Sequence, residues 1–159
     1  MENNNILRSL RYTFKFNDAK LPGIFAQAGR EVSQQQLSKW LKKDDEDGYE
    51  PIYDNDLAYF LNGFIIEKRG KKDDKLPVAE KRLTNNIVLR KLKIALNLKD
   101  EDMLEILGLV DFEISKHELS AFFRKPTQSQ YRPCKDQVLR YFLQGLTKKY
   151  KPASFNAKQ

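Results

Sequence analysis

The chain has 159 residues, of which 40% are hydrophobic and 32% charged, and its formal net charge is +7. This composition argues against intrinsic disorder and fits one domain of moderate size or two small ones. Apolar runs fall far short of the about 20 residues of a membrane span, so we expect no membrane segment. No signal peptide is recognisable, and the single cysteine, Cys134, fits a reducing compartment. We therefore expect a cytoplasmic protein.

The chain contains an internal duplication. Residues 3–67 align without a gap with residues 85–149, at an offset of 82. The identical pairs include Asn3 and Asn85, Leu7 and Leu89, Pro51 and Pro133, and Gly63 and Gly145. A repeat of this length indicates two copies of one structural unit. We predict a first repeat over 3–70, a charged linker over 71–84, a second repeat over 85–152 and a flexible tail over 153–159.

The sequence pattern of each copy predicts four helices, and the first two of these have clear apolar stripes. The first follows an asparagine cap and runs to about Phe16; its stripe consists of Leu7, Leu10 and Phe14, or of Leu89, Leu92 and Leu96. In the second helix, apolar residues at i, i+3, i+4 and i+7 are Leu21, Ile24, Phe25 and Ala28, or Met103, Ile106, Leu107 and Val110. We expect Asp18 and Asp100 to cap the second helix.

A capping box begins the third helix in each copy. Ser33 precedes Gln36 by three residues, and Ser115 precedes Glu118 in the same way. The fourth helix follows a Tyr-x-Pro turn and begins near Asp54 or Asp136. Its predicted core residues are Leu57, Phe60, Leu61 and Phe64, or Leu139, Phe142, Leu143 and Leu146.

Glycine recurs at one position inside the fourth helix, as Gly63 and Gly145. Glycine in a helix costs about 1 kcal/mol relative to alanine. Because both copies carry this cost, we predict that another helix approaches closely there. The complete prediction is an all-α fold of two tandem four-helix units, packed together with pseudo-twofold symmetry. The second and third helices of each unit, such as 24–41, form a pair like a helix-turn-helix.

Five stretches carry a resemblance to a known family. They are NNNILRSLRY at the start, WLKKDDEDGY at 40–49, FLNGFIIEKRG at 60–70, NNIVLRKLKIAL at 85–96 and LRYFLQGL at 139–146. The chain resembles the YehS-like family of small bacterial proteins, which are built from a repeated domain of unknown function. The resemblance covers nearly the whole chain. It implies a cytoplasmic protein of two like domains and assigns no activity, ligand or catalytic residue.

The charge is distributed unevenly between the copies. Residues 3–70 have no net charge, the segment 71–84 has +2, and residues 85–152 have +5. A basic half indicates an acidic partner, most commonly nucleic acid. The candidate nucleic-acid-binding residues are Arg90, Lys91, Lys93, Lys116, Arg124, Lys125, Arg132, Lys135, Arg140, Lys148 and Lys149. A solvated basic face without a ligand is the alternative, and Tyr131 and Tyr150 add base stacking if they are exposed.

The third helices offer a second candidate surface. The predicted outward residues are Gln34, Gln35, Ser38, Lys39 and Lys42, or Lys116, His117, Ser120, Ala121 and Arg124. Gln and Lys side chains in such a position are able to read base edges. Two features argue against this interpretation in the first copy, where the turn is long and the acidic run 44–47 repels phosphate. The alternative is an ordinary capped helix pair.

No pattern in the sequence predicts catalysis, a metal site or a cofactor. The loop around Asp45 and Asp54 lacks the first and last ligands of a calcium loop, and His117 and Cys134 are single residues of their kind. We therefore expect a non-enzymatic binding module. Nucleic acid is the first candidate partner, and another protein or a second copy of the chain is the alternative.

Overall fold

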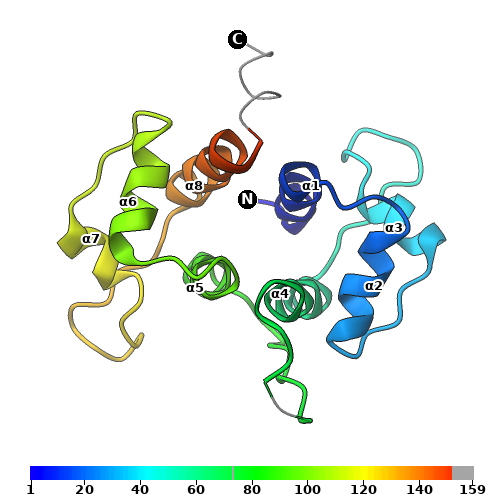
Figure 1. Ribbon diagram of the computed structural model, residues 1–159. Helices are drawn as coiled ribbons and strands as arrows, with labels where there is room; N and C mark the ends of the chain where they lie inside the picture. Colours follow the sequence, from blue (N-terminus) through cyan, green and yellow to red (C-terminus); the bar gives the residue numbers. More distant parts are fainter. Residues whose placement is uncertain (73, 152–159) are drawn as a thin grey trace. The chain divides into compact units, whose positions relative to one another are not determined.

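The computed structural model describes residues 1–72 and 74–151, which form eight helices and no strand (Figure 1). The all-α prediction is confirmed. The boundary predicted at residue 152 and the tail 153–159 lie outside the described residues. Contacts divide the chain into two compact units, Met1–Leu83 and the part that begins at Thr84. The pseudo-twofold packing of the units stays a prediction.

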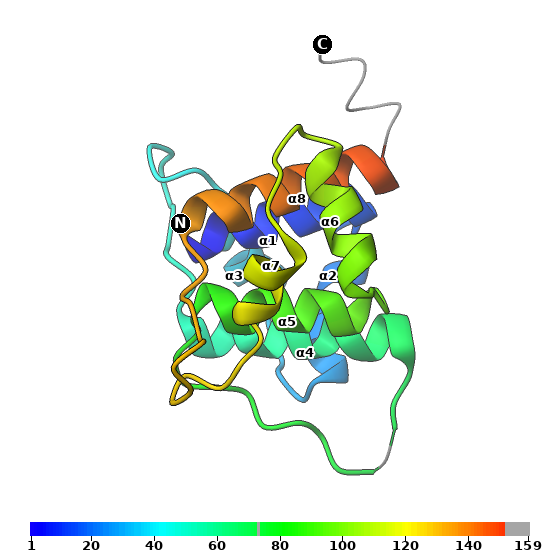
Figure 2. The ribbon, with the colours of Figure 1, turned by 90° about the vertical axis from the view of Figure 1, so that its left-hand side faces the viewer.

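The two units repeat the same order of helices. The first unit contains α1 (Asn3–Phe14), α2 (Lys20–Gln27), α3 (Gln34–Trp40) and α4 (Asp54–Arg69). The second contains α5 (Asn85–Ala95), α6 (Asp100–Gly108), α7 (Lys116–Ala121) and α8 (Asp136–Tyr150), and its helices are labelled in Figure 2. Helix bounds in the two units agree to within two residues at the offset of 82, which confirms the tandem repeat.

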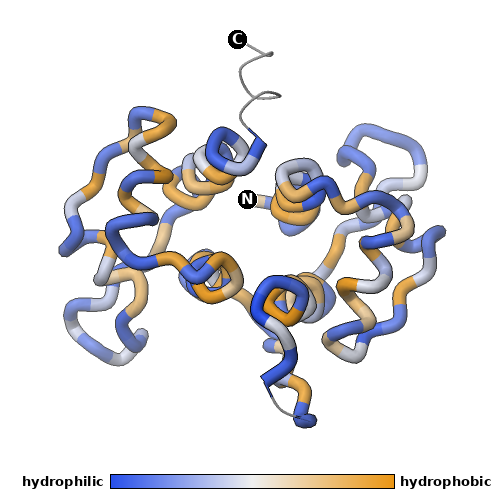
Figure 3. Tube along the Cα trace, in the orientation of Figure 1, coloured by the Kyte–Doolittle hydropathy of each residue, from blue (hydrophilic) through white to orange (hydrophobic). Residues whose placement is uncertain are grey.

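The predicted apolar stripes form the core of each unit. Helix α2 packs on α4, and α6 packs on both α7 and α8. The core of the first unit is rich in aromatic rings, with Phe25 between Phe60 at 5.3 Å and Trp40 at 5.9 Å between ring centroids. Figure 3 shows the hydrophobic residues along the helices, whereas the loops that join the third and fourth helices are mainly hydrophilic.

The recurring glycines lie at the closest helix contacts. A Cβ atom at Gly63 would come nearer than 3.0 Å to the main-chain carbonyl group of Ile24 on α2. At Gly145 a Cβ atom would also come nearer than 3.0 Å to the carbonyl oxygen of Ile106 on α6. The predicted close approach is therefore confirmed in both units.

The predicted caps of the first two helices are wrong. Asn3 and Asn85 are the first residues of α1 and α5, and the N-cap positions are Glu2 and Thr84. Only Thr84 caps with its side chain, accepting the N–H of Ile87 at 3.2 Å. The asparagines are needed elsewhere, because they bind the loop before the fourth helix.

Asp18 and Asp100 also make different contacts from the predicted ones. The Asn17 side chain accepts the N–H of Lys20 at the start of α2, at 2.8 Å. Asp18 pairs with Arg11 at 3.3 Å, and Asp100 pairs with Lys93 at 2.6 Å. These two ion pairs are equivalent at the offset of 82. The aspartates therefore join the first helix of each unit to the segment that begins the second.

The capping box of α7 is complete, and that of α3 is half formed. Glu118 and Ser115 exchange both bonds, at 3.0 and 3.1 Å. Ser33 accepts the N–H of Gln36 at 3.0 Å, but the Gln36 side chain donates to Glu50 instead. The distant carboxylate thus replaces the local partner that the sequence spacing predicts.

The second half of the connector is bound to the first unit. Leu76 lies against Gly29, where an added Cβ atom would come within 2.9 Å of its methyl group. The Asn55 amide donates to the carbonyl oxygens of residues 79 and 80, at 3.3 and 3.0 Å. Asp54 accepts the N–H of Leu83 at 2.8 Å. The segment predicted as a linker over 71–84 is therefore anchored almost up to Thr84, the cap of α5.

Candidate nucleic-acid interface

In each unit, the loop between the third and fourth helices is held by an equivalent set of hydrogen bonds. We call residues 41–53 the acidic loop and their counterpart, residues 123–135, the basic loop. In each, the N–H of a lysine (Lys43 or Lys125) donates at 2.9 Å to the side chain three residues later, Glu46 or Gln128. The main chains of the same residues bond in return, at 3.0 and 2.9 Å. The two loops therefore begin with the same turn.

A buried asparagine in α1 holds the acidic loop. The Asn4 amide nitrogen donates to the carbonyl oxygens of Trp40 at 2.8 Å and Glu50 at 2.9 Å. Its amide oxygen accepts the N–H of Ile52 at 3.2 Å. Asn4 is only 1% exposed, so these bonds satisfy main-chain groups that water does not reach.

Asn86 in α5 holds the basic loop in the same way. Its amide nitrogen donates to the carbonyl oxygens of Phe122 at 3.0 Å and Arg132 at 2.9 Å. Its oxygen accepts the N–H of Cys134 at 2.9 Å. Sequence analysis missed this role. The signal was present in the adjacent asparagines that recur in both copies, because a cap needs only one such residue.

The two loops have opposite charge on this shared frame. The acidic loop contains Asp44, Asp45, Glu46, Asp47 and Glu50 and has a net charge of −3. The basic loop has four cationic residues and no carboxylate, so its net charge is +4. Because the frame consists mainly of main-chain bonds and asparagine contacts, the difference in charge is not required for folding.

Five of the predicted binding residues belong to the basic loop or donate a hydrogen bond to its main chain. They are Arg90, Arg124, Lys125, Arg132 and Lys135, which we call the loop cations. Arg90 donates to the carbonyl oxygen of Phe123 at 2.7 Å, and Arg132 donates to those of Ser129 and Tyr131 at 3.0 and 2.9 Å. Within residues 1–72 and 74–151, no carboxylate forms an ion pair with any of the five. Their positive charges are therefore uncompensated.

The other predicted residues form contacts elsewhere, lie on the helices or, in the case of Lys93, contact the basic loop only through an aromatic ring. Lys93 pairs with Asp100 and lies 4.4 Å from the centroid of the Phe123 ring. Lys116 pairs with Glu101 at 2.6 Å, and this carboxylate raises the pKa of the lysine. Lys148 donates to the carbonyl oxygen of Leu109 at 2.9 Å. The remaining three residues are on the helices, Lys91 on α5 and Arg140 and Lys149 on α8.

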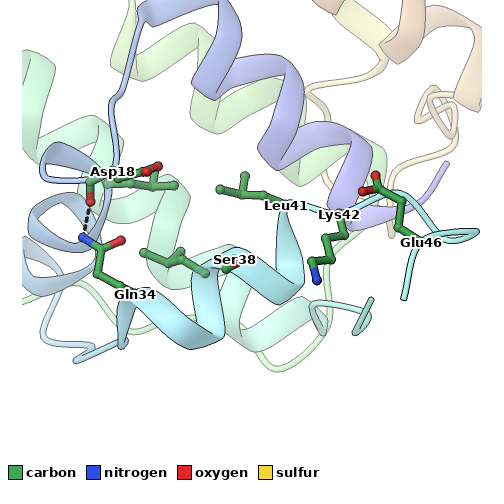
Figure 4. Close-up of a pocket in the computed structure, with 8 residues that line it drawn as sticks. Asp18, Gln34, Ser38, Leu41, Lys42 and Glu46 are labelled. Carbon is green, nitrogen blue, oxygen red and sulfur yellow. Dashed lines mark hydrogen bonds between the residues drawn. The ribbon is translucent and has the colours of Figure 1, made fainter. Parts of the chain in front are cut away.

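Three of the five side chains predicted to point outward from the third helix make contacts within the first unit. Gln34 donates to the main chain of Asp18 (Figure 4). Lys42 donates to that of Asp47 at 2.7 Å. Lys39 lies 3.4 Å from the Glu50 carboxylate. Helices α3 and α7 have only seven and six residues, and six residues separate α2 from α3. The helix-turn-helix interpretation stays a prediction, and these contacts do not favour it.

Figure 4 shows a pocket of about 390 Å³ on this face of α3. Its lining residues are Asp18, Leu21, Gln34, Leu37, Ser38, Leu41, Lys42 and Glu46. The apolar residues Leu21 and Leu37 are 0% and 2% exposed, so they offer little surface to a ligand. The carboxylates at the rim are unfavourable for phosphate.

Cys134 belongs to the basic loop and is buried, at 5% exposure. Burial, and to a smaller extent Asp136, raises the pKa of its thiol to about 12. At pH 8 the thiolate fraction is then only about 10⁻⁴, and the thiolate is the reactive form. We expect Ellman's reagent to react at least about 100-fold more slowly with the native protein than with the protein unfolded in guanidinium. A rapid stoichiometric reaction of the native protein would contradict this assignment.

Among the described residues, no group of three or more His, Cys, Asp or Glu side chains is arranged to hold a metal ion. His117 is exposed on α7. None of the helices in the described ranges is long and apolar enough to cross a membrane.

These features define a class of protein, a tandem helical repeat whose two copies present loops of opposite charge. The family model described as "Protein of unknown function (DUF1456)" matches residues 3–70 and 85–151, and the chain belongs to this family. It is similar to the "Uncharacterized protein YehS" of Escherichia coli (strain K12), with 47% identity over 148 residues, 92% of this chain and 94% of the relative. The YehS-like resemblance is thereby confirmed. No solved structure matches the chain.

Proposed function

We propose that this protein is a non-enzymatic binding module that holds the sugar–phosphate backbone of a nucleic acid on its basic loop. The observation that carries the proposal is the set of five loop cations without carboxylate partners. Uncompensated Lys and Arg side chains attract phosphates and release counterions when they bind them. The proposal includes a cytoplasmic location.

The first copy supports the proposal as an internal comparison. Its acidic loop has the same turn and the same asparagine contacts, but Glu50 stands where the basic loop has Arg132. A loop that served only to connect helices would need neither charge. The acidic loop would repel phosphate, so we assign one nucleic-acid site to each chain, in the second copy.

Self-association or binding to another protein is the second candidate. The observation that favours it is the opposite sign of the two loops, because the basic loop of one molecule complements the acidic loop of another. Association of this kind would appear as concentration-dependent oligomers at low salt without nucleic acid. Replacing the charged residues of either loop by neutral ones would abolish this self-association to the same extent.

The proposal is tested by fluorescence anisotropy with labelled 20-nucleotide RNA and DNA. We expect log K to fall with log salt concentration at a slope of roughly −3, since each phosphate contact contributes about −0.7 on a single strand. Changing Arg124, Lys125, Arg132 and Lys135 to Gln should weaken binding at low salt by about 100-fold and reduce the slope to near −1.

A control of equal net charge separates the loop from the overall field of the protein. The exposed connector residues Lys71, Lys72, Lys81 and Arg82 are changed to Gln, and binding should weaken by less than about threefold. Equal losses in the two variants would refute a site on the basic loop.

A graft tests the same site without removing any cation. The acidic run 44–47 is transferred to residues 126–129, as P126D, T127D, Q128E and S129D. The new Glu can accept the N–H of Lys125 as Glu46 accepts that of Lys43, so the free energy of unfolding should change by less than about 1 kcal/mol. Oligonucleotide binding should be lost, and a graft that binds like the native protein would refute the proposal.

A further inference from the structure

One tyrosine recurs in both loops but is bonded differently in each. In the acidic loop, the Tyr49 hydroxyl lies 3.3 Å from the carboxylate of Glu2 and 3.3 Å from the amide oxygen of Asn4. Desolvation and the Glu2 carboxylate raise the pKa of Tyr49. Tyr49 is therefore part of the frame that joins the acidic loop to α1.

The equivalent Tyr131 lacks these bonds. Thr84 stands in the place of Glu2, and its hydroxyl accepts the N–H of Ile87. The amide oxygen of Asn86 accepts the N–H of Cys134. In the part of the chain that the structure describes, the Tyr131 hydroxyl forms no hydrogen bond. The phenol is thus not needed to hold the basic loop.

Tyr131 lies in the basic loop next to Arg132, one of the loop cations. The guanidinium group of the adjacent Arg132 donates to the carbonyl oxygens of Tyr131 and Ser129. The Tyr131 N–H donates to the carbonyl oxygen of Gln128 at 3.1 Å, which places the tyrosine at the end of the turn that Lys125 begins. The Tyr131 side chain is partly exposed, and residues 127–130 are exposed. A partly exposed aromatic residue therefore belongs to the same loop as four of the loop cations.

We infer that the basic loop binds single-stranded nucleic acid, with one base stacked on the ring of Tyr131. This inference rests on the proposed function and names its substrate class. Recognition of base pairs in a duplex would need a helix or strand that enters a groove. Helix α7 is a poor candidate, because it has only six residues and its Lys116 pairs with Glu101. A single strand has bases free to turn toward an aromatic ring, and such stacking is tolerant of sequence.

The inference is tested with a 20-nucleotide single strand, its duplex and an abasic strand of equal length. The native protein should bind the single strand roughly tenfold more tightly than either other probe. Tyr131→Leu should remove this preference while the salt slope stays unchanged, because the cations remain. Tyr131→Phe should retain the preference, since the ring and not the hydroxyl stacks.

Tyr49→Leu is the matched control, and it should leave the preference for single strands intact. Thermal unfolding of each variant checks that the second unit is folded. Equal binding of the three probes by the native protein, or native-like discrimination by Tyr131→Leu, would overturn the inference while salt-dependent binding upheld the proposed function. Absence of any binding to the three probes would overturn both.

Discussion

Replacing Gly63 or Gly145 by alanine is expected to destabilise the protein by about 3 kcal/mol, although alanine is the better helix former. The added methyl group would lie against the main chain of Ile24 or Ile106, at less than 3.0 Å from the carbonyl oxygen. A main-chain group cannot rotate away as a side chain can, so α2 or α6 would have to shift. Overpacking of this kind costs about 1–3 kcal/mol, and the upper end applies where a backbone must move.

The measurement is urea unfolding of the single variants, followed by circular dichroism. Gly23 in α2 and Gly108 in α6 are matched controls, since an added Cβ atom meets nothing within 4 Å at either. Alanine at these two positions should raise the free energy of unfolding by up to about 1 kcal/mol. A stabilising effect of alanine at Gly63 or Gly145 would show that the helices do not approach as described.

Replacing Asn4 or Asn86 by alanine should cost about 3 kcal/mol. Each substitution removes three hydrogen bonds to the main chain and leaves two carbonyl groups and one N–H without that partner. Asn4→Ala also removes the bond from the Tyr49 hydroxyl. An unsatisfied buried polar group costs about 1–3 kcal/mol, and water entering the space offsets part of the sum. Asn5→Ala on the same turn is the control, because Asn5 is exposed, and its cost should stay below about 0.5 kcal/mol.

The Asn86 variant also links stability to the proposed function. Asn86→Ala leaves all loop cations in place but removes the bonds that hold Arg132 and Cys134. Oligonucleotide binding should weaken about tenfold with an unchanged salt slope, because a looser loop must be ordered on binding. Asn4→Ala should leave binding unchanged. Equal effects of the two variants on binding would place the interface elsewhere.

The sequence predicted the repeat, the helices and most of the core, because these depend on local spacing. The apolar stripe of α4 can be predicted from the spacing of its own residues alone, and Leu57, Phe60 and Leu61 are indeed all fully buried. The glycine contacts were also predictable, because a cost repeated in both copies needs a common physical reason. The predicted caps failed at Asn3 and Asp18, since their partners lie in distant loops or on another helix.

The candidate site was only partly predictable for a related reason. Sequence counts charges but does not show which of them are paired. Lys93 and Lys116 looked equivalent to Lys125, yet the fold places a carboxylate within 2.6 Å of each of the first two. The connector shows the same limit, because its charged composition indicated a free linker while Asp54 and Asn55 bind its second half.

The shared loop frame has a consequence for how such a duplicated gene can diverge. Apart from the Glu46 and Gln128 side chains, which accept the N–H groups of Lys43 and Lys125, the bonds that shape the two loops come from main-chain groups and from Asn4 and Asn86. Mutations in residues 44–47 or 126–129 therefore alter the surface at little cost in folding. A duplicated unit of this kind can therefore change the charge of one loop while both copies keep the same fold.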